Sequence, residues 1–422
     1  MVELPFFFWK KAFYLGTQNE SKLYLSRQKR FWLMEKNNYK IAYLTSVDPL
    51  DKKVLSGTIY TILKVLEKDV GSVDVLGPAK IDNAFTRILK RINYKLTRRY
   101  NFNHSIFYGI KYAWVFEKKL KDKHYDFIFA QRSSTEICRL KTDIPIIYYT
   151  DTTFKLFYNY YEWFSNFMKI SQIEGNKVEQ LAIDKSAIVI CTSQWAADSV
   201  INDYHASPEK VFIIPFGPNV DILPTREMIN YNKGRDVCKI LFIGVEWERK
   251  GGAIAFEALK EMKKKGIKTR LTIVGCRPPG EFQDEDMVVI PFLNKNEKSQ
   301  SDLFNQLLFE NHFFILPTRG ECFGVVFCEA SAFAIPSITT NTGGIGSAVE
   351  NGKNGFRLPV EARGDQYADL ISEIFTDYDN KYLPLAKSTR DFYDLRLSWK
   401  SWAGSLNAIL ENHKHLITKN NN

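Results

Sequence analysis

Two carboxylates stand eight residues apart in the stretch F-F-I-L-P-T-R-G-E-C-F-G-V-V-F-C-E, which runs from residue 313 to 329. The stretch predicts a buried strand over Phe313–Leu316, a turn, and a helix that opens near Phe323. Eight residues of helix span about two turns, or roughly 12 Å. Glu321 and Glu329 therefore cannot share one proton or one metal ion, but they can hold two parts of one extended ligand.

Hydrogen-bond donors are predicted beside these acceptors. The backbone N–H groups of Phe323, Gly324 and Val325 lie in the first turn of the predicted helix, where such groups point outward. Gly324 also lets a ligand approach the backbone closely. Acceptors beside donors suit a polyhydroxylated ligand such as a sugar. Taken alone, the same residues also fit a capped, half-buried helix with incidental acids.

E-C-F-G-V-V-F-C-E resembles the E-x7-E motif of the retaining nucleotide-sugar glycosyltransferases of family 4, which have the GT-B fold. The continuations A-S-A-F-A-I-P-S-I-T-T-N-T-G-G and V-E-N-G-K-N-G-F are also similar to that family. The resemblance extends from about Tyr39 to Ile409 and is stronger in the second half. It implies that Glu321 contacts the donor sugar and that Glu329 holds the ribose hydroxyls. The expected donor is a nucleotide-diphosphate sugar, and no cofactor is required.

A basic pair, Arg249 and Lys250, follows the apolar run K-I-L-F-I-G in the sequence E-W-E-R-K-G-G. We predict a loop that opens a helix there, where positive side chains oppose the helix dipole. Binding of a phosphate explains their presence, and two plain surface charges are the alternative. The resemblance implies that the pair holds the donor diphosphate, with Lys250 the better match, so no metal is needed. It also places Phe292 and Leu293 beside the base.

The first half offers two further candidates. Gly57, in S-G-T, separates an apolar strand from an apolar helix, and a helix N-terminus at such a place favours a phosphate. A plain turn is equally compatible, whereas the resemblance places this loop beside the diphosphate. Asp151 directly follows the run I-P-I-I-Y-Y-T, so it is expected to face the crevice beyond a parallel sheet. Its alternative role is a turn or helix-cap residue.

The length of 422 residues suits two domains. We predict an α/β fold of two Rossmann-like doubly wound domains that face each other across a cleft. The predicted parts are an aromatic and basic extension (1–38), an acceptor-side domain (39–220), a nucleotide-sugar domain (221–395) and a helix that crosses back to the first domain, with a tail (396–422). Twelve short apolar runs predict strands: 40–45, 73–76, 125–130, 144–150, 187–191, 210–215, 239–244, 271–275, 288–293, 313–316, 336–339 and 356–359.

Charge is distributed unevenly between the halves. Residues 1–220 hold 32 Lys and Arg against 22 Asp and Glu, whereas the remainder is neutral. A helix predicted over 83–100 carries apolar residues at helical spacing among six basic ones. Its basic side is either a solvated face or a face for anionic lipid. Residues 1–38 either pack on the first domain or lie at a membrane surface. Nucleic acid is disfavoured because no binding signature is present.

Cellular setting and metal content follow from residue spacing. The six cysteines form no C-x-x-C pair and predict reduced core thiols in a cytoplasmic protein. The basic and aromatic first half adds the expectation of a peripheral place at the inner face of the membrane. The acidic run at 284–286 predicts a solvated loop without positioned partners, not a metal site.

The hypothesis is transfer of a sugar to an acceptor hydroxyl, with retention, in cell-envelope polysaccharide or glycolipid synthesis. Asp151 or the donor phosphate would take the acceptor proton, and the acceptor would be a glycan or lipid-linked. The alternatives are a GT-B epimerase and a non-catalytic, membrane-associated sugar-binding subunit.

Overall fold

The computed structural model describes residues 38–52, 54–220 and 222–417, so all but one residue of the predicted 1–38 extension lies outside it. Two six-stranded sheets form its centre, and every strand pair within them is parallel. Each of the twelve predicted strands is present. Their bounds are β1 Tyr39–Leu44, β2 Gly71–Val75, β3 Phe127–Gln131, β4 Ile146–Thr150, β5 Ile188–Cys191, β6 Val211–Ile213, β7 Cys238–Ile243, β8 Thr269–Val274, β9 Met287–Ile290, β10 Phe313–Leu316, β11 Ser337–Thr340 and β12 Gly355–Leu358.

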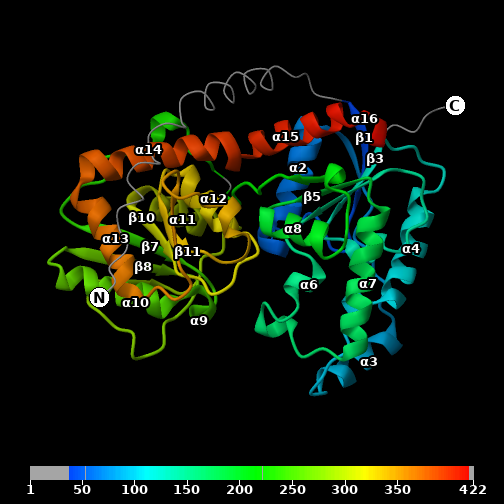
Figure 1. The fold of residues 1–422 in the computed structure, drawn as a ribbon, viewed down its shortest axis with the longest axis horizontal. Helices are drawn as coiled ribbons and strands as arrows, with labels where there is room; N and C mark the ends of the chain where they lie inside the picture. The colour runs from blue at the N-terminus through cyan, green and yellow to red at the C-terminus, as the bar shows by residue number, and fades with distance from the viewer. Residues whose placement is uncertain (1–37, 53, 221, 418–422) are drawn as a thin grey trace, which may run out of the picture.

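Strand order reverses once in each sheet. The first sheet runs β2-β1-β3-β4-β5-β6, and the second runs β12-β11-β10-β7-β8-β9. The chain therefore winds outward in both directions from β1 and β3 in one sheet, and from β7 and β10 in the other. Ligands of such sheets bind beyond the carboxyl ends of the strands at this switch point. The fold thus marks two places for functional groups, one in each half (Figure 1).

Helices connect the strands and cover the sheets (Figure 1). Their bounds are α2 Thr58–Asp69, α3 Ala84–Tyr94, α4 Ile106–Leu120, α5 Ser134–Ile137, α6 Phe154–Phe157, α7 Lys169–Lys185, α8 Gln194–Asn202, α9 Trp247–Lys250, α10 Gly252–Lys264, α11 Lys298–Glu310, α12 Val325–Ala332, α13 Gly364–Thr376, α14 Leu383–Phe392, α15 Trp399–Asn412 and α16 Lys414–Ile417. In the part of the chain that the structure describes, no helix has both the length and the apolar character needed to cross a bilayer.

The last long helix, α15, joins the two halves. It starts beside the second sheet and extends along the first, as Figure 1 shows. The indole N–H of Trp402 donates to the hydroxyl of Tyr149 at 3.2 Å, and the amide of Asn407 donates to the carbonyl oxygen of Asp69 at 3.1 Å. Trp402 is buried among rings of the first half. The predicted crossing helix is therefore confirmed.

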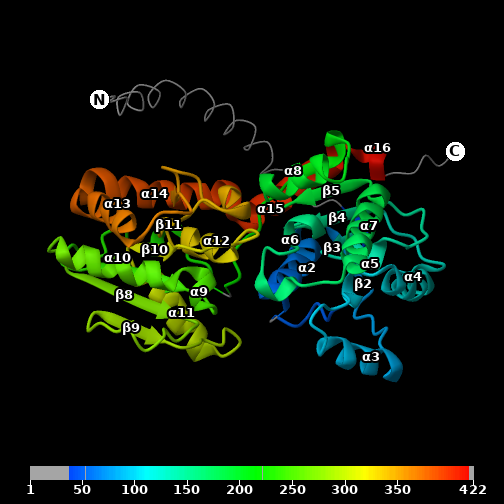
Figure 2. The same cartoon turned by 60° about the horizontal axis from the view of Figure 1, so that its bottom comes forward.

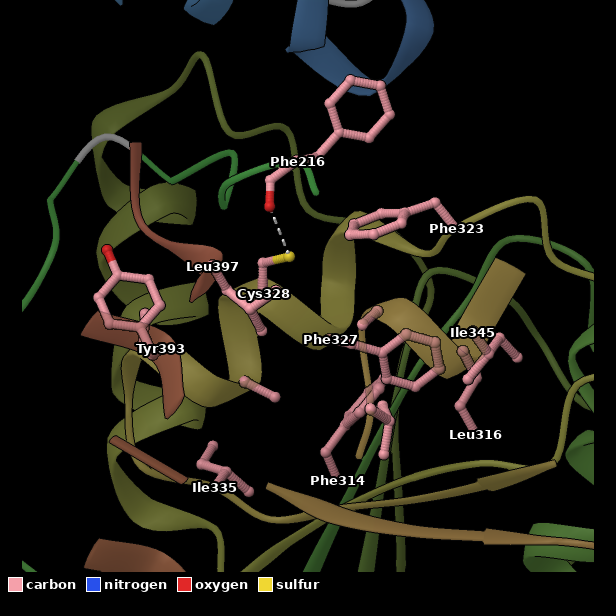
Figure 3. Packing of buried hydrophobic residues seen from close by; sticks show 14 of the residues in the cluster. Phe216, Phe314, Leu316, Phe323, Phe327, Cys328, Ile335, Ile345, Tyr393 and Leu397 are labelled. Carbon is pink, nitrogen blue, oxygen red and sulfur yellow. Dashed lines mark hydrogen bonds between the residues drawn. The ribbon is translucent and has the colours of Figure 1, made fainter. Parts of the chain in front are cut away.

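Helix α12, which carries Glu329, is fixed from two sides (Figure 3). Phe327 packs edge-on against Phe314 of β10, with ring centroids 5.7 Å apart. On the other side, the thiol of Cys328 donates to the carbonyl oxygen of Phe216, in the segment between the sheets, at 3.2 Å. The helix holding the second carboxylate thus touches both its own strand and the junction between the halves.

Two local predictions were wrong. The helix expected over 83–100 ends at Tyr94, and residues 99–102 instead run beside 166–171. Asp284 is not solvated, because the ammonium groups of Lys260 and Lys263 lie 3.0 and 2.8 Å from its carboxylate. These contacts hold the pKa of Asp284 at about 2, against the opposing effect of burial. The six cysteines are free and buried, as expected.

Candidate active site

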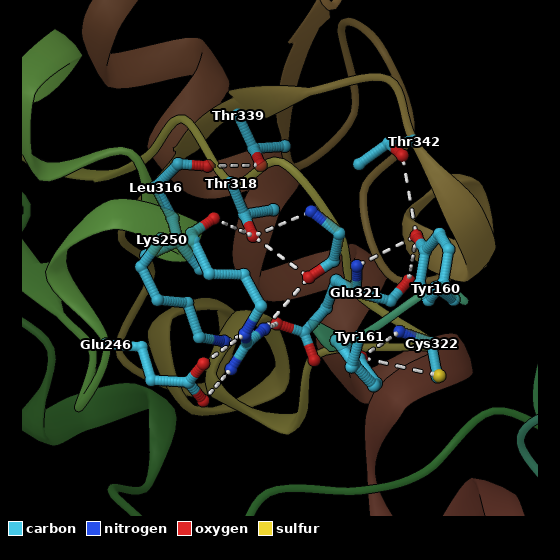
Figure 4. Close-up of polar contacts among 12 residues, drawn as sticks. Tyr160, Tyr161, Glu246, Lys250, Leu316, Thr318, Glu321, Cys322, Thr339 and Thr342 are labelled. Atoms are coloured by element: carbon cyan, nitrogen blue, oxygen red, sulfur yellow. Dashed lines mark hydrogen bonds and ion pairs between the residues drawn. The ribbon is translucent and has the colours of Figure 1, made fainter. Parts of the chain in front are cut away.

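Glu321 lies between the ends of the two central strands of the second sheet. It follows β10, and the basic pair follows β7, its neighbour at the switch point. The ammonium of Lys250 forms an ion pair with the Glu321 carboxylate, and the guanidinium of Arg249 lies 3.7 Å from the same oxygen. Figure 4 shows this cluster. The structure therefore brings Glu321 to a basic pair that lies 71 or more residues away in sequence.

The basic pair sits on a one-turn helix rather than in the predicted loop. Arg249 and Lys250 close α9, so their charges lie at its carboxyl end. The Glu246 carboxylate accepts a hydrogen bond from Arg249 at 2.7 Å, which lowers the pKa of Glu246. Arg249 also donates to the carbonyl oxygen of Gly320 at 2.9 Å, which fixes the turn before Glu321. Two cations and two carboxylates thus form one balanced cluster.

Two tyrosines of the first half contact the same turn (Figure 4). The backbone N–H of Glu321 donates to the hydroxyl of Tyr160 at 2.9 Å, and that of Cys322 donates to the hydroxyl of Tyr161 at 3.1 Å. The guanidinium of Arg249 lies 4.8 Å from the Tyr161 ring centroid. Burial and the charge of Glu321 raise the pKa of Tyr161, so its hydroxyl stays protonated. Both halves therefore form the surroundings of Glu321.

Glu329 lies at the junction of the two halves and is 3% exposed. Its carboxylate accepts from the ammonium of Lys295 at 2.8 Å and from the backbone N–H of Asn219 at 3.3 Å. The side chain of Asn219 in turn packs on Gly57, which caps α2 in a left-handed conformation (φ 77°). Gly57 and Glu329 are thus linked through one asparagine.

The remaining candidates lie at other strand ends. Asp151 follows β4 directly and is 9% exposed. The guanidinium of Arg132, which follows β3, lies 3.3 Å from its carboxylate. Burial lowers the pKa of Arg132, but several neighbouring groups, with the Asp151 carboxylate foremost, together outweigh burial and raise the pKa. Phe292 and Leu293 follow β9, the edge strand of the second sheet, and Phe292 is exposed.

Metal ligation finds no support in the same region. In the stretches 38–52, 54–220 and 222–417, no group of three or more His, Cys, Asp or Glu side chains is placed to hold a metal ion. The cations near Glu321 belong to the protein's own side chains.

Comparison with known families assigns both halves. The model of Glycosyltransferase Family 4 matches residues 57–221, and the model of Glycosyl transferases group 1 matches residues 238–377. The chain belongs to the glycosyltransferases of the family 4 type. Both sheets of the fold fall largely within these matches, so the family assignment covers the carboxyl ends of both sheets, where the candidate residues lie.

Individual relatives of this glycosyltransferase are distant. It is 22% identical over 250 residues to the D-inositol 3-phosphate glycosyltransferase of Corynebacterium kroppenstedtii, covering 55% of each chain. It is 26% identical over 228 residues to the capsular polysaccharide biosynthesis glycosyltransferase CapM of Staphylococcus aureus, covering 50% of this chain and 59% of that protein. The chain thus spans little more than half the length of these curated relatives.

The fold of this glycosyltransferase is similar to that of Anabaena HepE, whose crystal structure is in complex with UDP and glucose. The TM-score is 0.58, the identity is 16%, and the likeness covers 89% of this chain and 100% of that one. Together with the two doubly wound sheets, this likeness identifies the α/β fold as GT-B.

Sequence reasoning missed four residues of this glycosyltransferase that contact the candidates: Arg132, Tyr160, Tyr161 and Lys295. The tyrosines lie in the ring-rich run Y-N-Y-Y-E-W-F at 158–164, which is a detectable signal. Lys295 and Arg132 carry no local signal, because single cations in loops are ordinary surface residues.

Proposed function

We propose that this glycosyltransferase moves a sugar from a nucleotide-diphosphate donor to an acceptor hydroxyl, with retention of anomeric configuration. The observation that carries the proposal is the cluster of Lys250, Arg249 and Glu321 at the switch point of the second sheet. Cations at that place suit a diphosphate, and the carboxylate beside them suits sugar hydroxyls.

In the proposed reaction, the bond between the anomeric carbon and the diphosphate oxygen breaks. A bond from the acceptor oxygen forms on the same face, and the acceptor proton passes to the donor phosphate or to Asp151. Lys250 and Arg249 would stabilise the charge that grows on the departing diphosphate, as preorganised cations do best in a partly dry site. Glu329 would take the ribose hydroxyls, which requires the Lys295 ammonium to share or leave its carboxylate.

The donor and the product are also proposals. Because HepE is solved in complex with UDP and glucose, a uridine-diphosphate sugar is the first donor to test. The name of CapM favours a polysaccharide product. A GT-B epimerase would act on the same donor without an acceptor, and a non-catalytic subunit would bind it without turnover.

The test is a thermal-shift screen of nucleotide-sugars against wild type, Glu321→Ala and Lys250→Ala. A ligand that binds only the native state raises Tm by mass action. We expect one donor to raise the Tm of wild type and both variants to lose that increase. Lys264→Ala, an exposed lysine at the far end of α10, is the matched control and should keep it.

The stabilising donor is then incubated with candidate acceptors, and the anomeric configuration of the product is read by NMR. An inverted product contradicts retention, and an altered donor sugar without transfer favours the epimerase. If no nucleotide-sugar raises the Tm of wild type, the proposed function is wrong.

A further inference from the structure

Two neighbouring helices of the first half expose apolar stripes. Phe85, Ile88 and Ile92 lie at i, i+3 and i+7 on α3 and are 54–66% exposed. Phe107, Ile110 and Trp114 repeat the same spacing on α4 and are 48–70% exposed. We call these six residues the α3–α4 face. Apolar side chains that gather in this way on a surface mark an interaction site.

Helix α3 scarcely contributes to the core of its own domain. Of its eleven residues only Thr86 is buried, although the helix begins with a complete capping box at Asn83. Figure 2 shows α3 standing out from the body of the first half, with α4 beside it and the second half far away. Its amphipathic pattern is therefore well formed but is not used for packing within the described part of the chain.

Positive charge surrounds the apolar stripes. Residues 83–100 contain six basic residues and no acidic one. Among these six, Lys90 is the one with an ion pair in the described structure, to Asp82. Lys90 and Lys111 both lie over the Tyr108 ring, which ties the two helices together. The face thus combines exposed apolar groups with five nearby cations that form no ion pair in the described structure.

A hollow of about 210 Å³ opens at the end of α3. Lys90 and Arg99 contribute cations to its wall, and the rings of Tyr94, Tyr100 and Phe167 contribute apolar surface. The hollow thus places positive charge beside apolar surface.

We propose that the α3–α4 face docks on an anionic lipid bilayer. Long basic side chains reach phosphate headgroups while their stems and neighbouring rings lie at the acyl boundary. An anionic surface attracts each cation that comes near it. Nucleic acid would satisfy the cations but leave the isoleucine and phenylalanine side chains without a partner. The inference does not depend on the donor assignment, because none of these residues belongs to the candidate active site.

The test is co-sedimentation of the full chain with vesicles of phosphatidylcholine alone or with about one-third phosphatidylglycerol, at low and high salt. The apolar variant is Phe85→Ser/Ile88→Ser/Ile92→Ser. The charge variant is Arg87→Gln/Arg91→Gln/Lys95→Gln. The matched control, Lys298→Gln/Lys353→Gln/Lys387→Gln, removes the same charge from exposed positions of the second half.

We expect wild type and the control to bind anionic vesicles and not the neutral ones, and each α3 variant to bind at least about tenfold more weakly. All variants should keep the wild-type Tm and the donor-dependent thermal shift, because the changed side chains are exposed and remote from the site. A failed donor screen with intact vesicle binding would therefore contradict the proposed function alone.

Three results would overturn the docking proposal. One is wild type that ignores anionic vesicles at low salt. Another is an apolar variant that binds as wild type does, which would reduce the contact to charge alone. The last is a wild-type dimer that becomes monomeric in the apolar variant while vesicle binding is unchanged, which would assign the face to a second copy of the chain.

Discussion

The carboxyl ends of the two sheets carry different kinds of groups. Beyond the second sheet, Lys250 and Glu321 meet as charges supplied by neighbouring strands. Beyond the first sheet, Arg132 pairs with Asp151 and lies over the ring of Phe157. Paired charges hold their geometry before a ligand arrives, and the second sheet carries the larger set of them, because Glu246 and Arg249 join Lys250 and Glu321. This difference supports the proposal that the second half binds the charged donor.

The largest effect is expected from substitutions that disrupt the charge cluster of the second half. In Lys250→Met and Glu321→Gln, transfer should fall by roughly 10³-fold, as when preorganised charge stabilisation is removed from other active sites. The donor-dependent thermal shift should vanish with it. Steady-state transfer and the shift are measured on the same samples, with Lys264→Met as control. Variants that keep the thermal shift would place the donor elsewhere.

The next prediction is that the stabilities of the two halves depend on pH in opposite directions. His312 directly precedes β10 of the second sheet. It is buried, and its ring accepts a hydrogen bond from the backbone N–H of Lys239 at 3.1 Å. Burial lowers the pKa of His312 from 6.5 to about 4. As the pH falls, the imidazole of His312 is therefore protonated in the unfolded chain before it is protonated in the folded protein. The free energy of unfolding of the second half should decrease by roughly 3 kcal/mol as the pH falls from about 6.5 to about 4.

Glu179 should give the stability of the first half the opposite pH dependence. It is buried and accepts from the Tyr148 hydroxyl at 2.9 Å, and burial raises its pKa from 4.5 to about 7. The folded state keeps this proton longer, so the first half should lose a similar stability, roughly 3 kcal/mol, as the pH rises from about 4.5 to about 7.

Hydrogen exchange followed by mass spectrometry at about pH 5 and about pH 8 reports each half separately. His312→Gln should flatten the pH dependence of the second half, and Glu179→Gln that of the first. The same direction of change in both halves would refute the contrast.

A smaller effect concerns Asp151. In Asp151→Asn, transfer should fall by roughly 10²-fold if this carboxylate takes the acceptor proton. The donor-dependent thermal shift should persist, because Asp151 stands on the first sheet. Loss of that shift would show that the two halves do not divide the substrates as proposed.

The smallest effect tests how β10 positions the cluster. Gly251 (φ 76°) follows Lys250, and an added Cβ would overlap the carbonyl oxygen of Pro317. Gly266 has nearly the same φ of 75° but open space around it. Both substitutions to Ala introduce the same backbone strain, so the overlap with Pro317 should be the difference between them. Gly251→Ala should therefore lower the free energy of unfolding by about 2 kcal/mol more than Gly266→Ala does. Urea unfolding measures both, and equal losses would remove the steric argument.

Sequence reasoning succeeded where the signal is local. Both ends of the strand Phe313–Leu316 were predicted correctly, because a short apolar run between polar segments predicts a buried strand in an α/β chain. Glu321 and Lys250 were singled out separately, but their ion pair depends on the order β7–β10, which is set by the whole sheet.

Other features had no local signal. Tyr160 reaches Glu321 from 161 residues away, a contact between domains that no pattern within either domain contains. Helices α2 and α3 show why patterning alone is insufficient. Both are amphipathic, yet α2 buries six side chains and α3 only Thr86. Periodicity predicts which face of a helix is apolar, not what covers it.

The crossing of α15 has a consequence for the order in which the protein is made. Trp402, which follows all strands of the second sheet, fills space against Tyr149 of the first sheet. Domains usually fold as they leave the ribosome, the N-terminal one first. Here the domain translated first lacks part of its core until Trp402 emerges, whereas every strand of the second sheet precedes Trp402 and this sheet can close earlier. The N-terminal half therefore begins to fold first but completes its core after the second sheet can close.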